Sequence, residues 1–433
     1  MCVRIALVAA VCCAAGLAQA QESTVRVRVL SREAPASVTV RADATPLAVS
    51  VDGRPVGTLR PGQRAEIAAG GAGVEVRGDV RGRGGRVSLD GDGVALRAGP
   101  LDRRYAGSLE VSRAGGALQV VNAAPLGAYV SSVVASEYPF REIEGAKAQA
   151  VLARTYALRR AGGPNAYDVD DHTGSQVYRG AGAETDVSRR AAADTRGEVL
   201  LWAGALAEAP YFSSSGGHTA DNDAVWNGAP LPYLRGVPDP FDAGAPHHEW
   251  ETVVGQSRLH RVLSARFGGR VTGLRVLRRS RSGRVVEIEL HGARRPTITG
   301  SQFRRAVNAE LGSRTIRSTR FEIARDGGTY VFSGGGFGHG VGMSQYGARG
   351  QAQAGRSYRD ILGHYFAGTT LGSVGGPQTG GAPVATVGRP APGSAAAPPV
   401  GMGGVEVRRR PTPRREAREE AQQARRPKRR VAW

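Results

Sequence analysis

Cysteine is almost absent from this chain of 433 residues. Its three cysteines, Cys2, Cys12 and Cys13, lie in the segment MCVRIALVAAVCCAAGLAQA, where a basic residue, an apolar run and an Ala-Gln-Ala ending are typical of a secretory signal peptide. Cleavage after residue 20 would leave no cysteine for disulfides or thiolate metal ligands. We therefore expect a signal peptide over residues 1–20 and export to the periplasm, the cell wall or the extracellular space, with no metal and no cofactor.

Lysine is equally scarce, because Lys147 and Lys428 are the only two. The formal net charge of +20 is therefore carried by arginine, whose forked donors suit nucleic acid, anionic lipid or a carboxylate-bearing wall polymer. Export argues against nucleic acid as a partner. Residues 405–433 hold ten arginines and one lysine against four glutamates. This tail is either a solvated arm or a tether to an anionic wall polymer or membrane surface.

Long apolar runs and several common motifs are also missing. After the signal peptide no stretch is apolar for long enough to span a bilayer, so we expect a soluble or wall-bound product. No segment satisfies G-x-G-x-x-G, neither lysine completes a P-loop, and H-E-x-x-H is absent. These absences argue against dinucleotide, nucleoside triphosphate and zinc-protease chemistry.

The sequence divides into three parts after the signal peptide. Residues 21–121 alternate short Val-rich runs with Gly and Asp turns, which predicts a small β-rich region. Residues 122–372 mix helices and strands irregularly, which predicts an α+β domain with antiparallel strands. The predicted helices are 125–138, 142–160, 187–195, 255–267 and 300–311, and the predicted strands are 198–213, 271–278, 284–290 and 315–333. Residues 373–433, rich in Gly, Pro, Ala and then Arg, are predicted to be a disordered linker and tail.

One carboxylate lies at the end of a predicted helix. Apolar residues from Tyr129 to Val134 recur at helical spacing, and Pro139 predicts where that helix ends. Glu137 is therefore near a helix C-terminus, whose partial negative charge, together with burial, raises a carboxyl pKa toward that of a general acid. Arg154 and Tyr156 of the following predicted helix are free to face it.

A polar loop follows the predicted strand 198–213. The segment EAPYFSSSGGHTADNDAVW contains Ser213, Ser214, Ser215 and His218, which could form a rim that binds a sugar or an oxyanion. A serine hydrolase is the alternative, but the nucleophile-elbow spacing of glycine, serine and glycine is absent, and serine-rich turns are common.

Two further segments offer polar side chains. FSGGGFGHGVGMSQYGARGQAQAG places His339, Ser344 and Gln345 among glycines at the head of a helix, where the backbone can approach a substrate or another backbone closely. His339 suits a hydrogen bond better than a metal. HTGSQVYRG supplies Gln176 and Tyr178, with an ordinary loop as the alternative.

Two groups of acids have ordinary explanations. Asp168, Asp170 and Asp171 could bind a cation, although a solvated turn explains them as well. Asp239 and Asp242 are predicted to close turns around the proline between them.

Taken in order, these segments resemble the stage II sporulation protein D family (the SpoIID/LytB domain). The resemblance covers about 124–371 and rests on SEYP, AKAQAVLARTYAL, SQVYRG, YFSSSGGHTADNDAVW, PYLRGVPDPFD, RSRSGRV, TGSQFRRAV and GGGFGHGVGMSQYGARGQAQAGRSYRDILGHYFAGTTL. Two features depart from the family pattern. Phe140-Arg141 replaces a frequent Trp-Pro pair, and of the zinc ligands that some members carry only His172 remains, so we expect no metal.

The resemblance implies an exported lytic transglycosylase that cuts peptide-free glycan strands of peptidoglycan and leaves 1,6-anhydromuramic ends. Glu137 matches the acid of the family's E-x-P motif and would be the catalytic acid and base. The substrate-binding residues would be Arg154, Tyr156, Gln176, Tyr178, Ser213, Ser214, Ser215, His218, His339 and Gln345. Two alternatives stay open: a non-catalytic wall-binding enhancer of an N-acetylmuramoyl-L-alanine amidase, and an ordinary glycan hydrolase.

Overall fold

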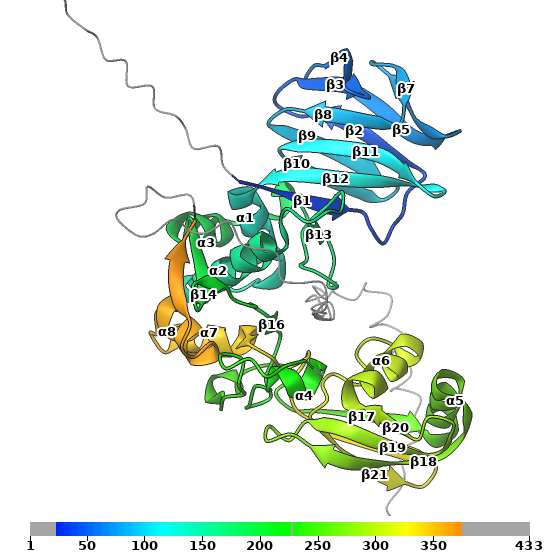
Figure 1. Ribbon diagram of the computed structural model, residues 1–433, viewed down its shortest axis with the longest axis vertical. Helices are drawn as coiled ribbons and strands as arrows, with labels where there is room; N and C mark the ends of the chain where they lie inside the picture. Colours follow the sequence, from blue (N-terminus) through cyan, green and yellow to red (C-terminus); the bar gives the residue numbers. More distant parts are fainter. Residues whose placement is uncertain (1–22, 227, 375–433) are drawn as a thin grey trace, which may run out of the picture. The chain divides into compact units, whose positions relative to one another are not determined.

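The computed structural model describes residues 23–226 and 228–374. Helices and mainly antiparallel strands are mixed along this part of the chain, after a β-rich N-terminal region, which confirms the α+β class (Figure 1). The predicted signal peptide, residues 1–20, and residues 375–433 of the predicted tail lie outside the described residues. No helix among the described residues is long and apolar enough to cross a membrane.

The N-terminal region folds into two β-sheets. Residues alternate between buried and accessible along most strands, as in TVRVRV of the first strand, so the buried valines of both sheets contribute to one core. The sheets have the orders β13-β1-β12-β11-β8-β3-β4 and β10-β9-β2-β5-β6-β7. Their strands are β1 (Thr24–Val29), β2 (Ser37–Ala42), β3 (Leu47–Val51), β4 (Arg54–Leu59), β5 (Arg64–Gly70), β6 (Gly73–Gly78), β7 (Gly82–Gly84), β8 (Arg86–Asp90), β9 (Gly93–Ala98), β10 (Leu101–Ala106), β11 (Ser108–Ala114), β12 (Ala117–Pro125) and β13 (Val169–Asp170).

The acidic cluster beside β13 joins it to the N-terminal strands. β13 pairs with β1 in parallel, and Asp168 and Asp170 form ion pairs with Arg26 and Arg28 of β1 at 2.7 and 2.6 Å. Asp171 accepts the backbone N–H of Leu30 in a buried hydrogen bond at 2.9 Å. These carboxylates therefore fix the strand with arginines and backbone donors.

Three helices follow the first sheet: α1 (Leu126–Glu137), α2 (Ile143–Arg160) and α3 (Asp186–Asp194). The predicted stripe from Tyr129 to Val134 is buried in the core. α1 ends at Glu137 and is capped by Tyr138, because the residue before Pro139 disfavours the helical conformation. The prediction of this helix end is confirmed.

The predicted strand 198–213 is wrong as a single element. It is divided into β14 (Glu198–Trp202), β15 (Ala205–Leu206) and β16 (Tyr211–Phe212), because Ala203 and Gly204 turn the chain with positive φ angles of 49° and 79°. β14 also pairs with β24 (Thr370–Ser373). The last residue of β24, Ser373, is the first residue of the predicted tail. β16 pairs in parallel with β23 (Met343–Ser344). Three short helices were not assigned bounds from the sequence: α4 (Asn222–Trp226), α7 (Gln345–Gln353) and α8 (Tyr358–Tyr365).

A second hydrophobic core lies between residues 250 and 332. Its two sheets have the orders β17-β22-β21 and β18-β19-β20, and its helices match the predicted ones within one residue. The predicted strand 315–333 is instead a hairpin that turns at Gly327 and Gly328. The elements are β17 (Trp250–Gly255), α5 (Gln256–Phe267), β18 (Gly269–Arg279), β19 (Val285–Ala293), β20 (Thr297–Thr299), α6 (Gly300–Leu311), β21 (Phe321–Asp326) and β22 (Thr329–Gly334).

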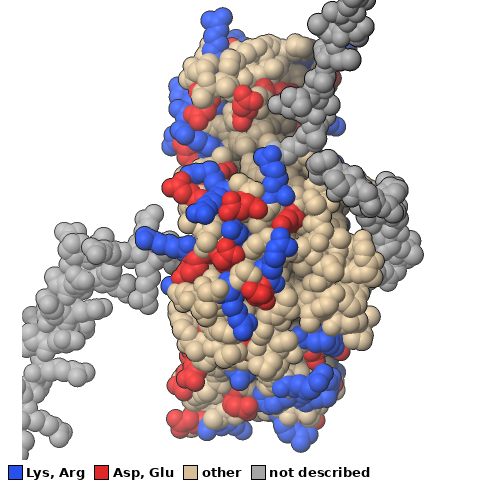
Figure 2. Space-filling view, turned by 90° about the vertical axis from the view of Figure 1, so that its left-hand side faces the viewer, with Lys and Arg blue, Asp and Glu red and all other residues tan. Residues whose placement is uncertain are grey.

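Arginine does not form a single uniform patch on the face drawn in Figure 2. Basic and acidic side chains alternate across the middle of that face. Ion pairs such as Arg275 with Glu289, at 2.9 Å, show how acids offset part of the positive charge locally.

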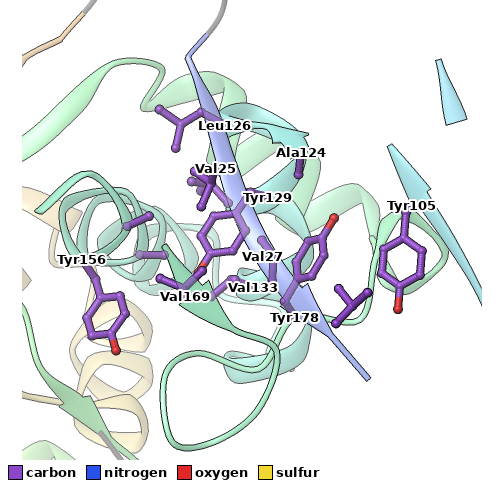
Figure 3. Close-up of a cluster of buried hydrophobic side chains, with 14 of the residues drawn as sticks. Val25, Val27, Tyr105, Ala124, Leu126, Tyr129, Val133, Tyr156, Val169 and Tyr178 are labelled. Carbon is purple, nitrogen blue, oxygen red and sulfur yellow. The ribbon is translucent and has the colours of Figure 1, made fainter. Parts of the chain in front are cut away.

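A buried tyrosine pair connects α1 to the N-terminal strands. The rings of Tyr129 and Tyr178 stack at 5.3 Å beside the valines of β1 (Figure 3). The Tyr178 hydroxyl donates to Oδ1 of Asn122 on β12 at 2.7 Å, and both residues are buried. Tyr178 therefore contributes a structural hydrogen bond.

We predict that Tyr178→Phe lowers the free energy of unfolding by about 1–3 kcal/mol, because it leaves the buried carbonyl oxygen of Asn122 without that donor. Tyr138→Phe is the matched control. Tyr138 is equally buried, but its hydroxyl has no hydrogen-bond partner among the described residues, so its removal should change stability by less than about 1 kcal/mol. Urea denaturation of both variants measures the difference, and equal losses would contradict the structural role of Tyr178.

Candidate active site

Glu137 is a buried acid at the C-terminal end of α1. Its side chain is 5% exposed, and Oε1 accepts the backbone N–H of Val177 at 2.8 Å. Burial raises the pKa of Glu137 to about 7, although hydrogen bonds from Val177, Gln345 and Tyr211 and the charge of Arg179 act in the opposite direction. The carboxyl can therefore exchange a proton near neutral pH, as acid and base catalysis require.

Gln345 reaches the same helix end from a distant part of the sequence. It is the first residue of α7, and its Nε2 donates to the backbone carbonyl of Glu137 at 2.6 Å. The preceding residue, Ser344, caps α7 by accepting the N–H of Gly347. The structure thus brings together Glu137 and Gln345, two residues that the sequence assigned to one site.

Gln176 belongs to a buried chain of hydrogen bonds behind Glu137. Its Oε1 accepts from the Tyr129 hydroxyl at 2.8 Å, and its Nε2 donates to the Tyr211 hydroxyl at 3.0 Å. Tyr211 in turn acts to lower the pKa of Glu137. Gln176 is fully buried, so it orients Tyr211. Sequence analysis missed Tyr129 and Tyr211 as site residues, because the first was assigned to the apolar stripe and the second preceded the serines that drew attention.

Arg154 and Tyr156 point in different directions. They are two positions apart on α2, which separates them by about 200° around the helix axis. Nη1 of Arg154 donates to the carbonyl of Glu198 at 2.8 Å, and its Nη2 donates to that of Ala192 at 3.2 Å. The Tyr156 hydroxyl lies 3.1 Å from that of Ser175. The expectation that both face Glu137 is corrected for Arg154, which connects α2 to α3 and β14.

The serine loop is organised by a carboxylate that the sequence assigned only to a turn. Asp242 is fully buried and accepts the hydroxyl of Ser214 and the backbone N–H groups of Ser215 and Gly216 at 2.8–3.0 Å. The hydroxyl of Ser344 donates to Oδ1 of this carboxylate at 2.8 Å. These donors are therefore occupied within the protein, which corrects the expectation of an open rim at Ser214 and Ser215.

The contacts of Ser213 and Ser214 bear on the alternative of a serine hydrolase. The carbonyl of Ser213 accepts the N–H of Tyr346 at 3.0 Å, which fixes the loop to α7. The Ser214 hydroxyl donates to Asp242, and the imidazole of His248 contacts the same carboxylate. No hydrogen bond from Ser214 to an imidazole is present among the described residues, so this arrangement does not favour a serine nucleophile.

The two predicted histidines have different surroundings. Nδ1 of His218, which is partly exposed, lies 2.7 Å from the carbonyl of Thr219. His339 is held at both ring nitrogens: Nε2 lies 3.0 Å from the carbonyl of Tyr211, and Nδ1 accepts the N–H of Val341 at 3.1 Å. Burial lowers the pKa of His339 to about 3. His339 is therefore neutral at physiological pH and acts as a positioning residue for Tyr211.

Metal ligands are not gathered in the described part of the chain. Within residues 23–226 and 228–374, no group of three or more His, Cys, Asp or Glu side chains is placed to hold an ion. The ring of His172 accepts the N–H of Gly174 at 2.8 Å.

Two family descriptions match this chain. Residues 114–202, which contain Glu137 and Gln176, match "SpoIID: Stage II sporulation protein". Residues 241–342, which contain Asp242 and His339, match "Domain of unknown function (DUF8618)".

Curated relatives each match more than half of this chain. The chain is 34% identical over 265 residues to stage II sporulation protein D of Bacillus amyloliquefaciens, which covers 57% of this chain and 74% of that protein. It is 33% identical to the protein of the same name from Bacillus subtilis, over 58% of this chain and 76% of the relative. It is 29% identical to an amidase enhancer of Bacillus subtilis, over 56% of this chain and 40% of the relative. The chain belongs to the stage II sporulation protein D family.

Proposed function

We propose that this protein is an exported lytic transglycosylase that cleaves peptide-free glycan strands of peptidoglycan. The observation that carries the proposal is the buried carboxyl of Glu137, whose pKa is raised to about 7 at the end of α1. The names of the relatives, stage II sporulation protein D and amidase enhancer, support a role at the cell wall.

A single carboxyl is enough for this reaction. Glycoside hydrolases ordinarily need one carboxyl to protonate the leaving oxygen and another to act as a nucleophile or to activate water. In the transglycosylase, Glu137 donates its proton to the glycosidic oxygen while the C1–O bond breaks. The resulting carboxylate then accepts the proton of the muramic 6-hydroxyl as that oxygen attacks C1. The products are a free 4-hydroxyl and a 1,6-anhydro ring, and Glu137 ends protonated.

The hydrogen bonds around Glu137 suit a group that must carry a proton in both directions. Burial favours the protonated form that begins the cycle, whereas donors from Val177, Gln345 and Tyr211 favour the carboxylate that follows. Intramolecular attack also gains effective concentration over water, which is worth about 7–11 kcal/mol in well-oriented systems. Ring closure is therefore favoured over hydrolysis.

The second candidate function is a non-catalytic enhancer of a cell-wall amidase, favoured by the similarity to the amidase enhancer. The two candidates differ in what the purified protein does alone. A transglycosylase releases anhydro-ended fragments from peptide-free glycan without a partner, whereas an enhancer only binds the wall. In both, the arginine-rich residues 405–433 provide contact with an anionic wall polymer or membrane surface.

We predict that Glu137→Gln abolishes release of anhydro-ended fragments, with kcat reduced by at least about a thousandfold, because the amide cannot deliver the proton. The amide oxygen can still accept the N–H of Val177, so thermal stability and glycan binding should be retained. Mass spectrometry of the products identifies the reaction, since an anhydro end is lighter by one water than a hydrolytic end.

Glu142→Gln provides the control for that substitution. Glu142 lies five residues after Glu137, and its carboxylate forms an ion pair with Arg349 at 3.1 Å. It has no part in the proposed proton transfer. It should keep turnover within a few-fold of the wild type. Turnover by Glu137→Gln at the control's rate would exclude Glu137 as the acid, and hydrolytic fragments from the wild type would show an ordinary glycan hydrolase.

We predict that kcat/KM is constant below about pH 6 and falls tenfold per pH unit above about pH 7, because only protonated Glu137 begins the cycle. The exposed charge of Arg179 lowers this pKa, so Arg179→Gln should move the alkaline limb to higher pH. Arg113→Gln, an exposed arginine on β11, is the control and should leave the limb in place. An unchanged or lowered limb in Arg179→Gln would contradict Glu137 as the titrating group.

A further inference from the structure

A cleft of about 850 Å³ opens beside the sheet β17-β22-β21. None of its lining residues is a hydrogen-bond partner of Glu137 among the described residues. Its lining includes bare backbone at Gly217, and its charged and hydroxyl side chains are His248, Arg320, Glu249, Glu251, Glu322 and Ser333. We call it the β17 cleft.

His248 is oriented into place by Asp242. Its Nδ1 lies 3.2 Å from Oδ2 of this carboxylate, so Nδ1 carries a proton and donates. Nε2 is left for a ligand: it accepts a hydrogen bond in the neutral imidazole and donates one to an anion in the protonated imidazole. Asp242 itself is fully buried and held by four further donors, whereas the side chain of His248 is 30% exposed. A partly exposed imidazole supported by a rigid buried carboxylate is prepared to bind a ligand.

Arg320 converges on the same place as His248. Its Nη1 donates to the carbonyl of Gly216. A Cβ atom at Gly217 would lie 3.6 Å from Cε1 of His248 and 3.9 Å from Nη1 of Arg320. The imidazole and the guanidinium therefore border one small space. A guanidinium next to an imidazole is an arrangement that binds carboxylate or phosphate.

The opposite wall of the β17 cleft presents hydrogen-bond acceptors. Glu251, Ser333 and Glu322 are directly opposite one another across the three strands, at the strand spacing of about 4.8 Å. Glu322 pairs with Arg279 at 2.7 Å, and Ser333 donates to Glu251 at 3.3 Å. This row disfavours an isolated phosphate, because two carboxylates would repel it. It suits a ligand that carries hydroxyl and amide donors as well as one carboxylate.

Both features fit an acidic amino sugar. We propose that the β17 cleft is a second glycan subsite that binds the lactyl carboxylate of a muramic residue through His248 and Arg320, while Glu251, Ser333 and Glu322 accept hydrogen bonds from sugar hydroxyl and acetamido groups. This inference rests on the proposed function, since it takes peptide-free glycan as the substrate.

α7 connects this subsite to the catalytic acid. Ser344 donates to Asp242, which supports His248, and the next residue, Gln345, donates to the carbonyl of Glu137. Consecutive residues at the start of one helix therefore fix both sites. A glycan held in the β17 cleft is thereby bound at a defined position relative to the acid.

The test compares two oligosaccharides that differ only in the lactyl group. Full-length Glu137→Gln protein is titrated calorimetrically with a peptide-free peptidoglycan octasaccharide and with a chitin octasaccharide, which has the same backbone without carboxylates. We expect the peptidoglycan strand to bind at least tenfold more tightly. Equal affinities, or binding of neither strand, would overturn the proposal.

Substitutions then assign that preference to the cleft. His248→Gln and Arg320→Gln, each added to Glu137→Gln, should remove the preference while leaving chitin binding within about twofold. Ser333→Ala should weaken both strands equally, since it changes only the acceptor row. A preference that survives both the His248 and the Arg320 substitution would overturn the subsite, as would binding of free stem peptide in the cleft with no preference between the strands.

Failure of this inference is separable from failure of the proposed function. Binding to the Glu137→Gln background does not depend on turnover, so the subsite can exist in a non-catalytic wall-binding protein. Conversely, release of anhydro-ended fragments by the wild type stands even if the lactyl preference is absent. In the active protein, Arg320→Gln should raise KM at least tenfold with kcat within about threefold of the wild type, and an unchanged KM would count against the subsite.

Discussion

A carboxylate withdrawn from water needs protein donors in place of its hydration, and Asp242 accepts hydrogen bonds from three segments, two of them distant in sequence. They come from the serine loop at 214–216, from Ser344 at the start of α7, and from His248. Each donor left unpaired in the interior would cost about 1–3 kcal/mol. The arrangement also constrains its neighbour, because burial and then the charge of Asp242 raise the pKa of Asp239 to about 6. The serine loop, α7 and the cleft wall therefore depend on one buried charge.

Glu137 is also a buried carboxyl group, with different surroundings. It has fewer donors than Asp242, and burial outweighs them, so its pKa moves from the ordinary 4.5 to about 7. That change corresponds to roughly 3 kcal/mol in favour of the protonated form. Both acids are buried, and they have different roles. Asp242 organises the segments around it, and Glu137 retains an exchangeable proton.

The helices and the end of α1 could be predicted from local sequence. Spacing from Tyr129 to Val134 and the proline at 139 specify a buried stripe and a stop, and both depend on interactions within a few residues. The division of the strand at Ala203 and Gly204 was missed because alanine gives no signal for a positive φ angle. Local patterns were thus sufficient where local sterics determine the backbone.

The candidate site was less predictable, because its contacts are long-range. Gln345 and Glu137 are 208 positions apart, and their contact follows from how β16 pairs with β23 and delivers the start of α7. Arg154 shows that residue type alone does not identify a binding residue. Its charge suggested that it binds the substrate, whereas its position on α2 directs it to carbonyl groups of α3 and β14. Asp242 reads as a turn residue in sequence, and only the tertiary fold reveals the donors around it.

A mechanism with one carboxyl places a strict demand on substrate position. The muramic 6-hydroxyl must lie close to C1 and to the carboxylate at the moment the glycosidic bond breaks, and a displacement of about 1 Å can cost a hundredfold in rate. Binding energy from groups away from the reacting bond can meet that demand if it is transmitted through rigid structure. Ser344 and Gln345 supply such a connection, since adjacent residues hold Asp242 and the end of α1. In the proposed mechanism, recognition of a distant carboxylate and alignment of the acid are thus parts of the same structural unit.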